Sequence, residues 1–224
     1  MNDMLLAGDD RAILGFAGRL NFRTKLVRPG FIRLSGVSSK GFPTGLAAMA
    51  EESAVDVLLL PPDLSLRRFR VACFDMDSTL IETEVIDELA ERAGVGDKVR
   101  EITASAMRGE IDFRESFSQR VALLKGLDVS VMEEIARSLP ITEGLERMMT
   151  ILKRVGYKTA ILSGGFTYFG NYLRQKYGFD YVYANELEIE DGRLTGRYVG
   201  EVVDGRRKAE LLRLLCQFEE INIA

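Results

Sequence analysis

The apolar and polar positions along the chain divide it into two parts with different rhythms. In the first part, residues 31–36 and 55–60 are strand-like apolar runs, and helix-forming residues at 44–52 separate them. Two consecutive prolines at 61–62 then interrupt both helix and strand. This pattern is too short to bury a large core. We therefore expect residues 1–66 to form a small α+β domain with a structural or regulatory role.

The second part, residues 67–224, begins with a short apolar run at 71–75 and then changes to helical spacing. Between residues 84 and 139, apolar side chains recur every three or four positions in four segments, and glycines separate these segments. Four helices inserted directly after one strand predict a helical cap over about 82–139.

Beyond residue 140, helical and strand-like segments alternate, which is typical of α/β proteins. The expected elements are a helix over 142–155 with Thr142 as its N-cap, a strand over 158–162, a helix over 166–177, a strand over 181–184, a hairpin over 187–200 that turns at Asp191 and Gly192, and a helix over 206–218. Strands that are separated by helices predict a doubly wound parallel sheet.

The amino-acid composition limits which binding partners and which cellular compartment we expect for this chain. The net charge of −4 gives no reason to expect nucleic acid or an anionic membrane as a partner. No apolar stretch approaches the ~20 residues that a membrane span needs, and the first residues lack the layout of a signal peptide. The chain has only two cysteines, and Cys73 lies inside an apolar run. A reducing, cytoplasmic location is the simplest expectation.

The chain contains no histidine. This absence excludes Ser-His-Asp and Cys-His catalysis and most zinc sites. Any proton transfer or nucleophilic attack must therefore use carboxylates, lysine, hydroxyl groups or tyrosine.

Polar side chains follow the apolar runs where the carboxyl ends of parallel strands would gather them. Asp75 and Asp77 end the first run, Ser163 and Gly164 follow the second, and Lys208 lies early in the last helix. A hydroxyl group, free amides at a helix start and an ammonium group suit a phosphate, and Mg²⁺ binds through one or two carboxylates with phosphate and water. Taken singly, each of these features is also typical of strand-end solvation, an ordinary turn or a solvated lysine.

Together these residues resemble a known family. The segments FDMDST at 74–79, SGGF at 163–166 and Lys208 are similar to the first three motifs of the haloacid-dehalogenase-like phosphatases. The similarity is closer to the phosphoserine phosphatases within that superfamily and covers residues 70–223, including ETEVIDELA at 82–90. The resemblance implies a Rossmann-type fold and a small-molecule substrate.

The resemblance also implies roles for the residues that match its motifs. Asp75 would be the nucleophile that forms an aspartyl-phosphate, and Asp77 would be the general acid and then the general base. Asp75 would ligate Mg²⁺ by its side chain, and Asp77 by its backbone carbonyl. Ser163 and Gly164 would hold the phosphate, and Lys208 would neutralise it.

Three cap residues complete the implied site. Glu84 would bind the substrate ammonium group, Arg120 would bind its carboxylate, and Phe113 would shield the cavity. A zwitterionic substrate needs one acid and one base, and the forked arginine side chain suits a carboxylate. Without the resemblance, Glu84 and Arg120 would be interpreted as parts of a solvated helix face.

The chain departs from the family pattern at its end. The family carries a fourth motif, G-D-G-x-N-D, whose aspartate completes the Mg²⁺ shell, and this chain ends at Ala224 before any such motif. We therefore expect a fragment whose phosphatase domain is truncated. Residues 1–66 resemble part of an ACT-like domain, a type that binds amino acids. The oligomeric state stays open, with a homodimer among the options.

The resulting hypothesis is a Mg²⁺-dependent phosphatase that converts O-phosphoserine and water to serine and phosphate, the last step of serine synthesis. One alternative is a phosphatase that acts on another small phosphomonoester. The other is a non-catalytic binding or regulatory protein, natural or produced by truncation.

Overall fold

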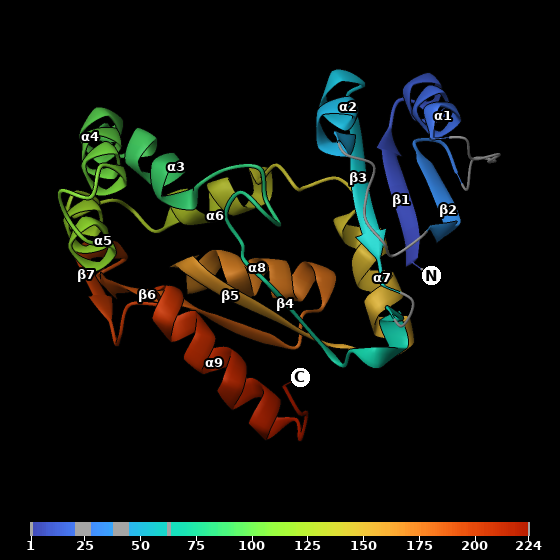
Figure 1. Ribbon diagram of the computed structural model, residues 1–224. Helices are drawn as coiled ribbons and strands as arrows, with labels where there is room; N and C mark the ends of the chain where they lie inside the picture. Colours follow the sequence, from blue (N-terminus) through green and yellow to red (C-terminus); the bar gives the residue numbers. More distant parts are fainter. Residues whose placement is uncertain (1, 21–27, 38–44, 62–63, 224) are drawn as a thin grey trace. The chain divides into compact units, whose positions relative to one another are not determined.

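The computed structural model describes residues 2–20, 28–37, 45–61 and 64–223 (Figure 1). The chain divides into two compact units, residues 1–68 and residues 69–224. Within the described residues, no helix is both long enough and apolar enough to cross a membrane.

The first unit is a small antiparallel sheet with two helices. Its elements in chain order are β1 (Asn2–Gly8), α1 (Asp10–Arg19), β2 (Phe31–Val37), α2 (Leu46–Glu52) and β3 (Val55–Leu60). The strand order is β2-β1-β3, so the first strand is the central one. The two expected strands are present, and a helix lies between them; the first residue of the expected helix, Thr44, lies outside the described residues. Strand β1 and helix α1 were not expected. The resemblance of this unit to the ACT fold stays a prediction.

The second unit carries the α/β sheet. Its elements are β4 (Val71–Phe74), α3 (Val85–Arg92), α4 (Gly96–Met107), α5 (Phe113–Ala122), α6 (Ser130–Ser138), α7 (Leu145–Val155), β5 (Lys158–Phe166), α8 (Thr167–Tyr177), β6 (Tyr181–Glu190), β7 (Arg193–Val199) and α9 (Gly205–Phe218). The strand order is β4-β5-β6-β7. The first three strands are parallel, and β7 pairs with β6 in the antiparallel direction.

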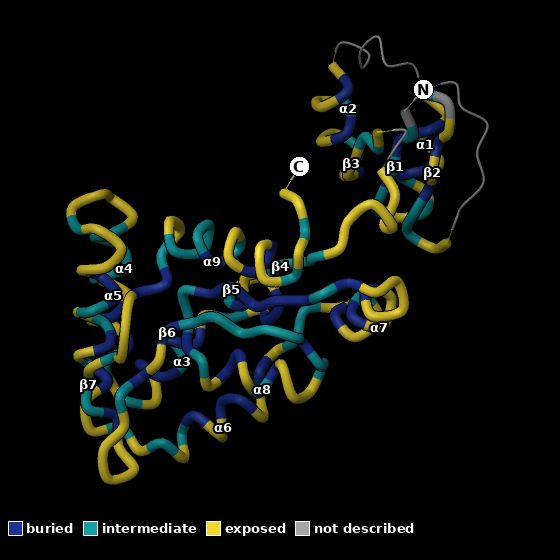
Figure 2. The backbone as a smooth tube through the Cα atoms, turned by 90° about the horizontal axis from the view of Figure 1, so that it is seen from below, coloured by how far each residue is buried: buried dark blue, intermediate teal, exposed yellow. Residues whose placement is uncertain are grey.

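Both faces of this sheet are covered by helices, which confirms the α/β fold class. Successive side chains of a strand point to opposite faces. Val71 and Cys73 of β4 belong to the apolar cluster beneath α9, whereas Ala72 and Phe74 belong to the larger cluster that includes α6, α7 and α8. Figure 2 shows the buried backbone of β5 between α9 on one side and α6 and α8 on the other.

Helices α3 to α6 occupy the segment expected for the cap. Helix α5 lies against β7, and its buried Phe117 packs on two aromatic rings of the sheet. The ring centroid of Phe117 lies 6.0 Å from that of Phe166 and 5.2 Å from that of Tyr198. This packing holds the start of α5 over the carboxyl end of β5.

Strands β5 and β6 are longer than the sequence pattern predicted. The expected strand ended at residue 162, but β5 continues to Phe166, and its pairing with β6 is irregular between Leu162 and Phe166. The strand over 181–184 and the first arm of the hairpin are one strand, β6. The hairpin turns where it was expected, because Asp191 and Gly192 both have positive φ, 48° and 75°.

The N-cap that was expected for α7 is wrong. The helix begins at Leu145, and the preceding residue, Gly144, has a left-handed φ of 89°. Thr142 lies one turn earlier, where its backbone N–H donates to the carbonyl of Leu80. The backbone of Thr142 therefore tethers the loop that follows β4 instead of starting the helix.

Candidate active site

A cavity of about 220 Å³ opens at the carboxyl ends of β4 and β5, between the sheet and the cap helices α3 and α5. Parallel sheets place ligand sites at this edge. Seven of the eight predicted site residues line the cavity: Asp75, Asp77, Glu84, Phe113, Arg120, Gly164 and Lys208. The eighth, Ser163, is buried behind the wall and reaches it through a hydrogen bond to Asp77.

Asp75 lies directly after β4 and faces Lys208 from the first turns of α9. The Lys208 Nζ atom lies 2.5 Å from the Asp75 Oδ2 atom. The other carboxylate oxygen of Asp75 accepts a hydrogen bond of 2.9 Å from the N–H of Met76. These contacts fix the direction of the Asp75 carboxylate, and its side chain stays accessible at 45% of its surface.

Asp77 is the more buried carboxylate of the pair. Its Oδ1 atom accepts from the N–H of Val85 at 2.8 Å, and its Oδ2 atom accepts from the Ser163 hydroxyl at 3.3 Å. Burial raises the pKa of Asp77 from 3.8 to about 6, the bond from Val85 opposes this change, and the charges of Glu84 and Asp75 add to it. A carboxyl group whose pKa is raised toward neutrality is better suited to protonate a leaving group and later to accept a proton.

The SGG segment forms the end of β5 instead of a turn. The N–H of Gly165 donates to the Ser163 hydroxyl at 2.9 Å. A side chain at Gly165 would lie 2.2 Å from the Asp77 Oδ2 atom, and one at Gly164 would lie 3.2 Å from the ring of Phe113. Both glycines therefore allow the backbone to approach the cavity closely.

Asn185 is a site residue that the sequence interpretation missed. Its buried amide on β6 donates to the carbonyl of Gly164 at 2.7 Å, and its Oδ1 atom accepts from the N–H of Val203 at 2.8 Å. Asn185 thus ties the end of β5 to the segment that leads into α9 and Lys208. The available signal was a lone asparagine in the strand YVYANELEIE, since a buried amide needs partners.

The cap contributes an acid and a base to the cavity. The Ser78 hydroxyl donates to the Glu84 Oε1 atom at 2.8 Å, and Ser78 has a left-handed φ of 53°. Arg120 is half-buried, and its Nε–H donates to the carbonyl of Ser116 at 3.3 Å. Burial lowers the pKa of Arg120, while the charges of Asp87 and Glu84 raise it.

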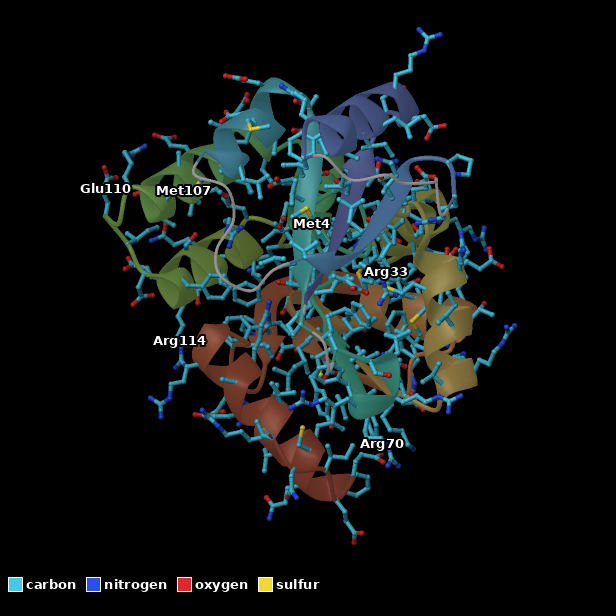
Figure 3. All side chains as sticks on the ribbon, turned by 45° about the vertical axis from the view of Figure 1, so that its right-hand side comes forward. Met4, Arg33, Arg70, Met107, Glu110 and Arg114 are labelled. Atoms are coloured by element: carbon cyan, nitrogen blue, oxygen red, sulfur yellow. The ribbon has the colours of Figure 1, made fainter. Side chains whose placement is uncertain are left out.

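An ion pair links the cap to the start of α9. The Arg114 Nε atom on α5 lies 2.8 Å from the Asp204 Oδ2 atom, and Asp204 is the N-cap residue of α9. Figure 3 shows Arg114 between the cap helices and α9. The pair therefore joins the helix that carries Phe113 to the helix that carries Lys208.

The oxygen atoms near the cavity suit a hard cation. Among the described residues, no three His, Cys, Asp or Glu side chains form a preassembled metal cluster. Mg²⁺ usually takes only one or two carboxylates and completes its shell with substrate phosphate and water. The accessible Asp75 carboxylate, which lies on the cavity wall with Asp77, fits such a site.

Comparison with known proteins gives consistent matches for the second unit. The profile of the haloacid dehalogenase-like hydrolase family matches residues 72–224. Phosphoserine phosphatase from Archaeoglobus fulgidus is 48% identical over 173 residues, which cover 77% of this chain and 50% of that protein. The chain spans about half the length of the first curated relatives it matches.

Solved structures agree with these matches. The crystal structure of a probable phosphoserine phosphatase from Vibrio cholerae has a TM-score of 0.81 and 31% identity, over 99% of this chain and 70% of that one. A phosphoserine phosphatase structure described as a phospho-aspartyl intermediate analogue has a TM-score of 0.64 and 42% identity, over 68% of this chain and 73% of that one.

Proposed function

The chain belongs to the haloacid dehalogenase-like hydrolase family, and on this premise we propose that it hydrolyses O-phosphoserine to serine and phosphate. The phosphoserine phosphatases among its relatives support this substrate. The observation that carries the proposal is the division of charge in one cavity. Asp75, Asp77 and Lys208 lie on the sheet side, and Glu84 and Arg120 lie on the cap side.

This division matches the three charged groups of phosphoserine. A phosphate on the sheet side would meet the Lys208 ammonium group and the backbone at Gly164, and the buried Ser163 hydroxyl would have to turn from Asp77 to reach it. The substrate ammonium group would meet Glu84. The carboxylate would meet Arg120, whose two terminal nitrogens form no hydrogen bond or ion pair within the described residues. A half-buried guanidinium with free donors is suited to binding a carboxylate in a bidentate manner.

The reaction would proceed in two displacements. A carboxylate oxygen of Asp75 forms a bond to phosphorus, the bond from phosphorus to the serine oxygen breaks, and that oxygen takes a proton from Asp77. Asp77 then removes a proton from a water molecule, whose oxygen attacks the phosphorus and releases Asp75. The raised pKa of Asp77 supports its role as an acid first and a base afterwards.

Mg²⁺ would be held by the side chain of Asp75 and the backbone carbonyl of Asp77. When bound, the ion neutralises phosphate charge and orients the phosphoryl group for in-line attack. Lys208, at 2.5 Å from Asp75, adds a fixed positive charge and holds the nucleophile in place.

Phosphate release from O-phosphoserine with Mg²⁺ present tests the proposal. We expect Asp75→Asn to abolish release, because the amide is not a nucleophile, while the fold is retained. Asp97→Asn is the matched control, since the Asp97 side chain on α4 is 97% exposed and should leave the rate unchanged. Equal rates for wild type and Asp75→Asn would refute the proposal.

A further inference from the structure

A second cavity of about 540 Å³ adjoins the first on the cap side. The two cavities share Glu84, Phe113 and Arg120 in their walls. Ser116 on α5 also lines the second cavity and does not line the first. The groups proposed to bind the amino-acid part of the substrate thus have an additional polar neighbour.

The hydroxyl of Ser116 is unusual because it has no hydrogen-bond partner. Ser116 is 1% exposed, and its Oγ atom is the buried side-chain polar atom without a partner in the described part of the chain. Helical hydroxyl groups usually donate to the carbonyl four residues earlier. Such bonds are present at Thr103, Ser118, Ser138 and Thr150. Ser116 lacks this bond, and a buried polar group without a partner requires an explanation.

Ser116 and Arg120 lie one turn apart on the same face of α5. Long side chains on a helix lean back toward its N-terminus, so the side chain of Arg120 extends over the turn of Ser116. The bond of 3.3 Å from Arg120 Nε to the carbonyl of Ser116 demonstrates this approach. An anion that binds the free guanidinium nitrogens therefore lies near the free hydroxyl group.

We propose that Ser116 is a further substrate-binding residue, whose hydroxyl donates to the substrate carboxylate beside Arg120. The inference rests on the proposed function and adds a determinant of specificity to it. Ser116 lines the second cavity, so this contact requires its hydroxyl to point toward the cavity wall that Ser116 forms. The ligand class is an α-amino acid phosphomonoester, as opposed to a phosphorylated amine without a carboxylate.

The test compares Ser116→Ala with wild type on two compounds. O-Phosphoserine is the substrate, and phosphoethanolamine is a competitor that has the phosphate and ammonium groups but no carboxylate. We expect the variant to raise the KM for phosphoserine about tenfold or more, since hydrogen bonds to charged groups contribute strongly. The inhibition constant of phosphoethanolamine and the kcat for phosphoserine should stay within about twofold.

Two controls separate binding from folding. Ser138→Ala on α6 removes a hydroxyl that bonds within its own helix. It should leave the KM for phosphoserine and the inhibition constant of phosphoethanolamine unchanged. Ser116→Ala removes a buried hydroxyl that has no partner, so the Tm of the variant should not fall below that of wild type.

An unchanged KM, whatever the Tm, would overturn the inference and leave Ser116 a packing residue. An equal rise in the KM and in the inhibition constant would also overturn it, because the carboxylate would not be what the hydroxyl recognises. A wild-type protein that does not hydrolyse phosphoserine would refute the proposed function itself, and that result is distinct from both.

Discussion

Asp75 and Asp77 are only two residues apart, yet their surroundings differ. Asp75 lies at the accessible side of the cavity against Lys208, whereas Asp77 is covered by the first turn of α3 and by Ser163. Two carboxyl groups whose surroundings differ in this way can take the separate roles of nucleophile and acid. The burial of Asp77 should also affect the stability of the protein, which can be measured without an activity assay.

We expect the stability of Asp77→Asn relative to wild type to increase as the pH rises from about 4 to about 7. The folded pKa of Asp77 lies above its ordinary value, so the folded state binds more protons in this window, and the wild type loses stability as the carboxyl group ionises. The shift in the pKa of Asp77 from 3.8 to about 6 corresponds to an increase in the relative free energy of unfolding of up to about 3 kcal/mol.

The measurement is the difference in free energy of unfolding by urea between variant and wild type, without added Mg²⁺, across that pH range. Asp97→Asn, on an exposed side chain, should show a flat difference. A flat difference for Asp77→Asn as well would contradict the burial of its charge.

At the level of elements, Asn185 connects the end of β5 to the start of α9. Asn185→Ala would remove the hydrogen bonds that its side chain makes with the N–H of Val203 and with the carbonyls of Gly164 and Gly165. We expect it to lower the free energy of unfolding by about 2–4 kcal/mol, because each buried unsatisfied group costs about 1–3 kcal/mol. Urea unfolding measures this loss. Asn171→Ala, on the exposed face of α8, should cost less than about 1 kcal/mol, and an equal cost for both variants would contradict the bridging role.

The helices and strands differ in how well the sequence pattern could predict them. Helices α3 to α6 and α9 were predictable because their apolar residues repeat at helical spacing. The extension of β5 through Ser163, Gly164 and Gly165 was not, since small polar residues after an apolar run usually indicate a turn. Only the pairing of Phe166 with Asn185 on the neighbouring strand reveals that the strand continues.

The same limit applies to the site. Asp75, Asp77 and Lys208 occur in recognisable motifs, so their proximity could be anticipated. Asn185 and Ser116 belong to no such motif. Only the structure shows that the Asn185 amide bonds the end of β5 and that the Ser116 hydroxyl has no partner among the described residues. A sequence pattern records which residues are polar, but not which polar atoms lack or share a partner.

For the whole molecule, the cavity brings Asp75 and Asp77 from the sheet together with Glu84 and Arg120 from the cap, and we propose catalysis for the first pair and substrate recognition for the second. Glu84→Ala and Arg120→Ala should each raise the KM for phosphoserine about tenfold or more, because each leaves a substrate charge unpaired. Glycerol phosphate has neither the ammonium nor the carboxylate group, so its kcat/KM should change by less than about threefold. Kinetics on both substrates check this, and equal losses on both would favour another phosphomonoester as the substrate.

The central claim is that Asp75 carries the phosphoryl group during turnover. Its most direct test is mass spectrometry of peptides from the full-length protein after acid quenching of its reaction with O-phosphoserine and Mg²⁺. We predict one added phosphoryl group on the peptide that contains Asp75, absent in Asp75→Asn and lost when the quenched protein is brought to alkaline pH, since acyl phosphates hydrolyse readily. Steady release of phosphate with no phosphoryl group on that peptide, or with the group on a different residue, would contradict the account.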